Sequence, residues 1–320
     1  MGRLKNRRVL VTGASSGIGA AAAHLLAREG ADVALLARNE KGLREVARRV
    51  EGEGRRSVRV RADITDREAL ERAVDRAAAS LGAAERDDDH AAGGGLDVVI
   101  VAAAAGAFGR FEEIPPDDFD RCVAVSFGGA VNTIRAVLPH LERSHGRLVV
   151  IGSAVDTIPL SLLSPYVAAK AALDALLHSL GAELRAADSN VSVSVVRPGA
   201  VDSPFWRHLT HPAGLKPPEI PPLTAYSPES VAAAAVDLAV APRPSITVGG
   251  TTIALQVASL VARPLVERAF ALVSRLGRST AQPEPSPRAL WEPSGDGTVH
   301  GGLGGRPSAL AAAQRLLSRR

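Results

Sequence analysis

The sequence predicts an α/β fold: a doubly wound, mostly parallel sheet of about seven strands with helices on both faces, followed by a C-terminal extension. Short apolar runs alternate with helical patterns as far as residue 250. Apolar strands separated by helices imply a parallel sheet that is buried on both sides. A glycine-rich turn follows the first apolar run, as in folds that bind nucleotides at the edge of such a sheet. The alternation ends after residue 250, which places the extension at residues 251–320.

Composition and charge are those of an ordinary globular protein. The 320 residues are 46% hydrophobic and 22% charged, with a formal net charge of +4 spread along the chain, so we expect no nucleic-acid partner. The single cysteine, Cys122, excludes an intrachain disulfide and fits a reducing compartment. The N-terminus lacks the apolar stretch of a secretory signal. These features predict a cytoplasmic location.

The first strand and the turn after it form a candidate nucleotide-binding loop. Val9–Val11 is a buried-strand run, and Thr12–Gly19 leads into the helical stretch Ala20–Glu29. Glycines permit a tight turn and let backbone N–H groups reach a pyrophosphate at the start of a helix. The spacing Gly-x-x-x-Gly-x-Gly differs from the common Gly-x-Gly-x-x-Gly. The loop predicts dinucleotide binding, with a purely structural turn as the alternative.

The second strand, Ala31–Ala37, ends at a position that selects the coenzyme. Dinucleotide folds use an acidic side chain here to bind the 2′-hydroxyl of the adenosine ribose, and an arginine can accept a 2′-phosphate instead. This strand ends at Arg38, with no acid at that position. The sequence thus favours NADP(H) over NAD(H), although NAD(H) stays possible if Arg38 only faces solvent.

The third and fourth strands bracket a long polar insertion. Ser57–Ala62 closes on Asp63, and the fourth strand, Asp97–Val101, ends in small residues. Between these strands, residues 81–95 contain three adjacent aspartates beside His90. Such a group could suggest a metal, but a solvated loop is the more common meaning. We therefore expect no metal site.

A tyrosine and a lysine share one helical face beside the end of the fifth strand. Pro165 can occupy the first helical position, so Tyr166 and Lys170 stand i,i+4. A nearby positive charge favours phenolate and lowers the pKa of a tyrosine, which makes Tyr166 a candidate general acid and base. Ser153 follows the strand Arg147–Ile151 and could steady a substrate oxygen. Taken alone, such a pair more often marks the edge of an amphipathic helix.

The segment after the sixth strand is rich in proline. Residues 202–228 contain seven prolines together with Phe205 and Trp206, which predicts a long loop that acts as a lid. Ser227 can cap the next helix, and Ser245–Val248 reads as the last strand.

The extension divides into a helical part and a part of low complexity. Thr252–Leu276 is apolar and helical but interrupted by charges, so we expect amphipathic helices that pack on the body or lie at a membrane surface, without crossing the membrane. Residues 279–308 are rich in proline, glycine and serine. They predict a disordered or loosely draped chain before a short terminal helix from Ser308.

These motifs occur together in one order and spacing, and in this the chain resembles the short-chain dehydrogenase/reductase family over roughly residues 5–250. The shared features are Thr12-Gly-x-x-x-Gly-Ile-Gly19, Asp63, Ser153 placed 13 residues before Tyr166, Tyr166-x-x-x-Lys170 and Pro198-Gly199. The resemblance implies a Rossmann-type dinucleotide-binding and catalytic domain over residues 1–250. It also implies an NAD(P)-dependent oxidoreductase that often forms dimers or tetramers through helices such as Pro165–Leu184.

The resemblance implies a role for each matching residue. Tyr166 would be the general acid and base, Lys170 would lower its pKa and bind the nicotinamide ribose, and Ser153 would orient the substrate oxygen. Arg38 would hold a 2′-phosphate. The other coenzyme contacts would come from Gly13, Ser15, Ser16, Gly17, Ile18, Gly19, Asp63, Ile64, Ala104, Gly106, Pro198, Val201 and Ser203.

Two departures from the family pattern concern catalysis. The family usually carries Asn-Asn-Ala-Gly after the fourth strand, where this chain has Ala103 and Ala104 in place of the asparagines. The family's helix asparagine, which shapes a water-mediated proton relay to the lysine, falls at Ser126. Serine could still hold that water, with a shorter reach. A catalytically impaired, NADP(H)-binding regulatory protein is therefore the alternative to an active enzyme.

The sequence as a whole predicts an NADP(H)-dependent oxidoreductase that interconverts a carbonyl and an alcohol by hydride transfer. Ser126 would belong to its proton relay. The expected partners are a small, apolar carbonyl or alcohol substrate and further copies of the chain, in a homodimer or homotetramer. An apolar substrate pocket, or simply the packing of the lid, is expected from Val155, Leu160, Phe205 and Trp206.

Overall fold

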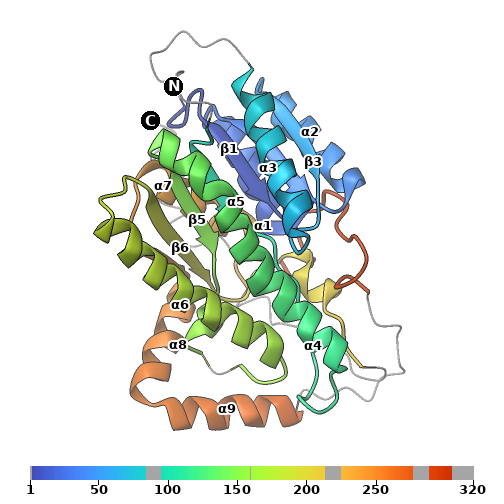
Figure 1. The fold of residues 1–320 in the computed structure, drawn as a ribbon. Helices are drawn as coiled ribbons and strands as arrows, with labels where there is room; N and C mark the ends of the chain where they lie inside the picture. The colour runs from blue at the N-terminus through green and yellow to red at the C-terminus, as the bar shows by residue number, and fades with distance from the viewer. Residues whose placement is uncertain (1, 84–94, 159, 213–224, 277–287, 305–320) are drawn as a thin grey trace.

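A computed structural model of the chain describes residues 2–83, 95–158, 160–212, 225–276 and 288–304. The predicted sheet is confirmed. Seven strands, all paired in parallel, lie in the order β3-β2-β1-β4-β5-β6-β7 (Figure 1). They are β1 (Arg8–Thr12), β2 (Asp32–Ala37), β3 (Ser57–Arg61), β4 (Val98–Val101), β5 (Arg147–Ile151), β6 (Ser192–Pro198) and β7 (Ser245–Val248).

Helices cover both faces of this sheet, as predicted, and make a three-layer molecule. One apolar core joins the sheet to α1 (Gly17–Arg28), α2 (Glu40–Gly52) and α7 (Pro228–Val240). A second core on the opposite face joins it to α3 (Arg67–Gly82), α5 (Gly129–Ser144) and α6 (Ser164–Ala186). Because β1, β2 and β4 are buried along their whole length, they read as mainly apolar runs in the sequence.

Local signals fix where the helices begin. The Asp66 side chain accepts a 3.0 Å hydrogen bond from the Ala69 N–H at the start of α3, and Ser227 caps α7 ahead of Pro228. The Ser227 cap was expected from the sequence, because a side-chain oxygen at the N-cap satisfies an N–H group that the helix leaves free.

The strand order places a crevice in the middle of the sheet. β1 pairs with β2 on one side and with β4 on the other. Successive strands are therefore added toward one edge of the sheet up to β3, and toward the other edge from β4 onward. Open parallel sheets bind ligands at the carboxyl ends of strands at such a point. The turns after β1, β2, β4, β5 and β6 therefore converge on one edge of the sheet.

A turn of π-helix, Ala124–Gly128, separates α4 (Pro116–Val123) from α5. By length and composition, Pro116–Ser144 is the one helical stretch among the described residues that could cross a membrane. Half of its most apolar window is buried inside the molecule, as in the core helix of a globular protein.

The helical part of the extension forms α8 (Gly250–Val261) and α9 (Arg263–Leu276). α8 contacts β7, and both helices lie below α6 in Figure 1. Both helices carry exposed apolar side chains. These are Ile253, Val257, Leu260, Val261, Leu265 and Leu272.

Residues 279–308 were predicted to be disordered or loosely draped, and of these the structure describes residues 288–304, an irregular segment that we call the C-terminal strap. The strap lies against the body, and its Leu290 side chain is fully buried. Hydrogen bonds join the backbone of the strap to polar groups at the edge of the sheet. The helix predicted from Ser308 lies outside the described residues.

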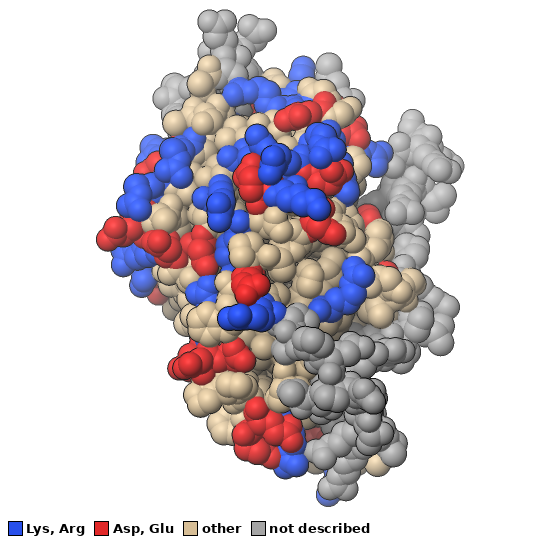
Figure 2. Space-filling view, turned by 90° about the vertical axis from the view of Figure 1, so that its right-hand side faces the viewer, with Lys and Arg blue, Asp and Glu red and all other residues tan. Residues whose placement is uncertain are grey.

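Charged side chains are interspersed over the surface. On the face in Figure 2, basic and acidic groups lie beside one another. Ion pairs occur on the surface of the described residues, such as Arg59–Glu40 at 3.1 Å. The three aspartates and His90 of the polar insertion lie outside the described residues, as do residues 213–224 of the proline-rich segment. Within the described ranges no cluster of His, Cys, Asp or Glu could hold a metal ion.

Candidate active site

A cavity of about 600 Å³ opens at the carboxyl edge of the sheet, across the ends of β1, β2, β4, β5 and β6. All the side chains predicted to bind coenzyme or substrate line it, while Ser126 lies behind its wall. The lining includes Gly13, Ser15, Ser16, Gly17, Ile18, Gly19, Arg38, Asp63, Ile64, Ala104, Gly106, Ser153, Val155, Leu160, Tyr166, Lys170, Pro198, Val201, Ser203, Phe205 and Trp206.

The turn after β1 needs its glycines. Gly13 and Gly17 have φ angles of 67° and 54°, in the left-handed region that side chains disfavour. A Cβ atom on Gly19 would lie 2.3 Å from the carbonyl oxygen of Gly13. The glycines thus let the turn fold tightly and bring the N-terminus of α1 to the cavity, where its free N–H groups favour an anion.

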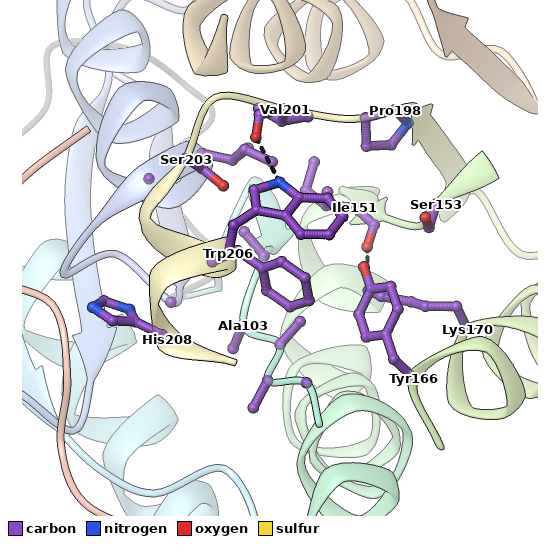
Figure 3. A pocket seen from close by; sticks show the side chains of 18 of the residues that line it. Ala103, Ile151, Ser153, Tyr166, Lys170, Pro198, Val201, Ser203, Trp206 and His208 are labelled. Carbon is purple, nitrogen blue, oxygen red and sulfur yellow. Dashed lines mark hydrogen bonds between the residues drawn. The ribbon is translucent and has the colours of Figure 1, made fainter. Parts of the chain in front are cut away.

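Three polar side chains meet at the ends of β5 and α6. The structure brings Ser153, Tyr166 and Lys170 to one side of the cavity (Figure 3). The Ser153 hydroxyl lies close enough to the Tyr166 hydroxyl to favour its ionised form. The Lys170 ammonium lies 5.8 Å from the centre of the Tyr166 ring and donates a 2.8 Å hydrogen bond to the Ile151 carbonyl oxygen. The two helical residues therefore face the same way, as their i,i+4 spacing requires.

Burial dominates the titration of this pair. It raises the pKa of the Tyr166 phenol above its ordinary value, although the neighbouring Ser153 hydroxyl acts in the opposite direction. It lowers the pKa of the Lys170 ammonium to about 8. The sequence led us to expect a lowered tyrosine pKa, and in this structure the direction is the reverse. The reason is that protein encloses the phenol, and enclosure penalises the phenolate.

Ser126 holds the backbone of the loop after β4. It lies in the π-helical turn with no exposed surface. Its hydroxyl donates a 2.7 Å hydrogen bond to the Ala105 carbonyl oxygen and accepts a 3.0 Å one from the Ala105 N–H. Cys122 lies against the same carbonyl, and burial raises the pKa of its thiol to about 12. The thiol is thus an unreactive core group.

A pair of arginines surrounds Asp63 at the adenosine end. Arg121 donates a 2.7 Å hydrogen bond to the Asp63 carboxylate, and the Arg38 guanidinium lies 3.8 Å from it. Burial alone would raise the pKa of Asp63, but hydrogen bonds from Thr65 and Arg121 hold it below its ordinary value. Arg121 belongs to no motif, so the sequence gave no signal for it.

An apolar wall stands beside Tyr166. The Phe205 ring centre lies 5.0 Å from that of Tyr166 and 5.5 Å from that of Trp206. The Trp206 indole N–H donates a 3.0 Å hydrogen bond to the Val201 carbonyl oxygen, which fixes the indole over the cavity (Figure 3). Phe205 and Trp206 come from the short 3-10 helix Pro204–His208 of the proline-rich segment.

Several lining residues were not predicted. They come from α8, α9, the proline-rich segment and the C-terminal strap, and they are Thr251, Thr252, Leu255, Phe270, His208, Ala289 and Ser294. The amphipathic pattern of the extension indicated helices, but not which face would meet the cavity.

Together these groups can exchange a proton with a ligand oxygen at Tyr166 and hold an extended dinucleotide along the glycine turn. The chain matches the family described as short chain dehydrogenase over residues 7–213. It is 28% identical over 268 residues to the "Uncharacterized oxidoreductase YxnA" of Bacillus subtilis (strain 168), covering 83% of this chain and 72% of that protein.

Two solved structures share the fold and carry nicotinamide coenzymes. A short chain dehydrogenase from Mycobacterium paratuberculosis, bound to NAD, is 25% identical with a TM-score of 0.65, covering 77% of this chain and 97% of that one. An alcohol dehydrogenase from Thermococcus sibiricus, complexed with 5-hydroxy-NADP, is 28% identical with a TM-score of 0.63, covering 75% of this chain and 95% of that one. The chain is thus an NAD(P)-dependent oxidoreductase of the short-chain dehydrogenase/reductase family.

Proposed function

We propose that the protein is an NADP(H)-dependent oxidoreductase that interconverts an apolar carbonyl compound and its alcohol. The observation that carries the proposal is the grouping of Tyr166, Ser153 and Lys170 in the wall of a cavity that runs across the ends of five strands. The single, buried Cys122 fits a reducing compartment, so we further propose that the enzyme works in the cytoplasm.

The cavity suits a nicotinamide coenzyme. The glycine turn offers the N-terminus of α1 to a pyrophosphate, and the small side chains after β4 leave room beside it. Arg38, at the end of β2, would hold the 2′-phosphate that distinguishes NADP(H) from NAD(H). Lys170 would bind the nicotinamide ribose. When bound, the nicotinamide would give or take the hydride.

The remaining chemistry belongs to the side chains of the chain. In the reducing direction, Tyr166 donates its proton to the substrate oxygen, and Ser153 holds the same oxygen by a hydrogen bond. The Lys170 ammonium stabilises the phenolate that Tyr166 becomes. In the oxidising direction, Tyr166 takes the proton back. Because burial raises the pKa of Tyr166, the resting group is the phenol, which suits the donor role.

The substrate class follows from the wall beside Tyr166. Phe205, Trp206 and Leu160 present apolar surface to the cavity, and Phe270 of α9 adds to it. An apolar pocket with few polar groups favours a hydrophobic ketone, aldehyde or alcohol over a charged metabolite.

A coenzyme-oxidation screen tests this function. The protein is mixed with NADPH or NADH and with steroid, fatty and aromatic carbonyls, and the loss of reduced coenzyme is followed by absorbance. We expect turnover with NADPH on at least one apolar carbonyl. NADPH binding without turnover on any substrate would favour the alternative of a catalytically impaired regulator, which the alanines at Ala103 and Ala104 motivate.

We also propose that the protein forms a homodimer or homotetramer through α6. The outer face of this helix carries exposed small side chains, which allow close approach of a second helix. They are Ala168, Ala172, Ala175 and Ala182. Sedimentation velocity of the wild type against Ala175→Arg checks this. A monomeric wild type would contradict the proposal.

A further inference from the structure

The C-terminal strap contacts three strand ends in turn, along the edge where the cavity opens (red in Figure 1). Its first part lies on Arg38 after β2, its middle on the turn after β1, and its last part on Asp202 after β6. Ala289 and Ser294 of the strap line the cavity themselves. The strap thus meets the places at which a dinucleotide would be held.

Backbone carbonyl oxygens of the strap accept hydrogen bonds from the guanidinium of Arg38. Nη2 donates to the Ala289 oxygen at 2.7 Å and to the Glu292 oxygen at 3.1 Å, and Nη1 donates to the Leu290 oxygen at 3.1 Å. A 2′-phosphate would need the same donors. A carbonyl is a neutral acceptor, whereas a phosphate is charged and binds a guanidinium more strongly.

The strap also occupies the N-terminus of α1. The Gly17 N–H donates a 2.9 Å hydrogen bond to the Thr298 carbonyl oxygen, and the Gly297 N–H donates one of 2.9 Å to the Ser15 oxygen. The N-terminus of a helix favours a negative group. The Thr298 carbonyl therefore takes a donor that a pyrophosphate oxygen would otherwise use.

Leu290 is the apolar anchor of the strap. Its side chain is fully buried beside Ile114 and Cys122. Next to it, the Trp291 indole N–H donates a 2.7 Å hydrogen bond to Asp118. These contacts keep the strap on Arg38 without a contribution from any ligand.

We propose that the C-terminal strap is an intramolecular competitor of the coenzyme phosphates and modulates the choice between NADP(H) and NAD(H). NADP(H) displaces strap carbonyls from both Arg38 and Gly17. NAD(H) lacks the 2′-phosphate, so it displaces only the contact at Gly17. The inference rests on the proposed function, because it takes Arg38 as the 2′-phosphate site.

Hydrogen exchange on the full chain gives the first test. Exchange of the strap peptides is followed by mass spectrometry without coenzyme, with saturating NADPH and with saturating NADH. We expect faster exchange with NADPH than in the two other samples. Slower exchange with NADPH would mean that the strap closes over the coenzyme, and this would overturn the proposal.

A variant that releases the strap gives the second test. Leu290→Lys places a charge in a buried apolar site near Arg38 and Arg121, so the strap should leave. We expect the Kd for NADPH, measured by fluorescence titration, to fall about tenfold and that for NADH about threefold or less. Leu272→Lys on the exposed side of α9 adds the same charge away from the strap and should change neither value.

A chain that ends before Arg288 serves as a second release variant, with its fold checked by circular dichroism. Unchanged or weaker NADPH binding in both release variants would overturn the competitor role while leaving the proposed function intact. If neither coenzyme binds any form of the protein, the proposed function fails and the inference fails with it.

Discussion

The Lys170 ammonium donates a 2.8 Å hydrogen bond to the carbonyl oxygen of Ile151, the last residue of β5. This bond fixes the lysine between the sheet and α6, with only 4% of the residue exposed. One carbonyl cannot replace the hydration of an ammonium, so the folded state holds the lysine proton less tightly than the unfolded chain does.

The first prediction concerns stability against pH. The pKa of Lys170 is lowered from 10.5 to about 8, so the unfolded chain binds more protons between these values and the free energy of unfolding rises with pH there. Relative to Lys170→Met, the wild type should gain about 2 to 3 kcal/mol between pH 7 and pH 10. Urea unfolding at several pH values measures this gain.

The exposed Lys5 provides the control for that series. The Lys5→Met variant should follow the wild type at every pH. Parallel curves for the wild type and Lys170→Met would show that the Lys170 proton is held equally well in both states, against the prediction.

Removal of the Tyr166 hydroxyl should abolish most of the chemistry. We expect Tyr166→Phe to lower kcat by about a hundredfold to ten-thousandfold, the usual range for a general acid, with the Kd for NADPH within about threefold of the wild type. Tyr226, whose hydroxyl is bonded to Thr251, supplies the matched control as Tyr226→Phe. Equal kcat values for the wild type and Tyr166→Phe would remove Tyr166 from the mechanism.

Arg38 should decide the affinity for the 2′-phosphate. In the chain that ends before Arg288, where the strap no longer competes, Arg38→Ala should weaken NADPH binding by about tenfold to a hundredfold. NADH binding should change by less than about threefold. Arg61→Ala, at the exposed end of β3, is the control. Equal losses for both coenzymes would mean that Arg38 does not recognise the phosphate.

Ser126 should matter for stability. The Ser126→Ala variant leaves the Ala105 N–H without its partner inside the molecule, which costs about 1 to 3 kcal/mol. Ser80→Ala on the exposed side of α3 should stay within about 0.5 kcal/mol of the wild type. Chemical denaturation compares the three proteins. A stability of Ser126→Ala equal to that of the wild type would contradict a structural role for this hydroxyl.

Much of the fold could be predicted because its signals are local. Strands such as β1, β2 and β4 are mainly apolar runs, and caps such as Asp66 and Ser227 stand at helix starts. The grouping of Tyr166 and Lys170 was predictable for the same reason, since i,i+4 spacing fixes their common face. Ser153 joined them because strand ends meet at one edge.

What the sequence could not predict depends on contacts between distant segments. Arg38 was expected to face a phosphate or solvent, and it bonds instead to the strap, more than two hundred and fifty positions later in the chain. Backbone carbonyl groups bind the Arg38 guanidinium, and every residue type has one. The amino-acid composition therefore does not reveal which residues will bind it. The pKa of Tyr166 likewise depends on enclosure by the whole fold, which no spacing reports.

The place of the strap in the chain has a consequence for biosynthesis. The ribosome joins Val248, the last residue of β7, before it reaches Arg288. Every strand that carries the nucleotide crevice is therefore synthesised before any residue of the strap, which makes the strap the last described part of the site to be made.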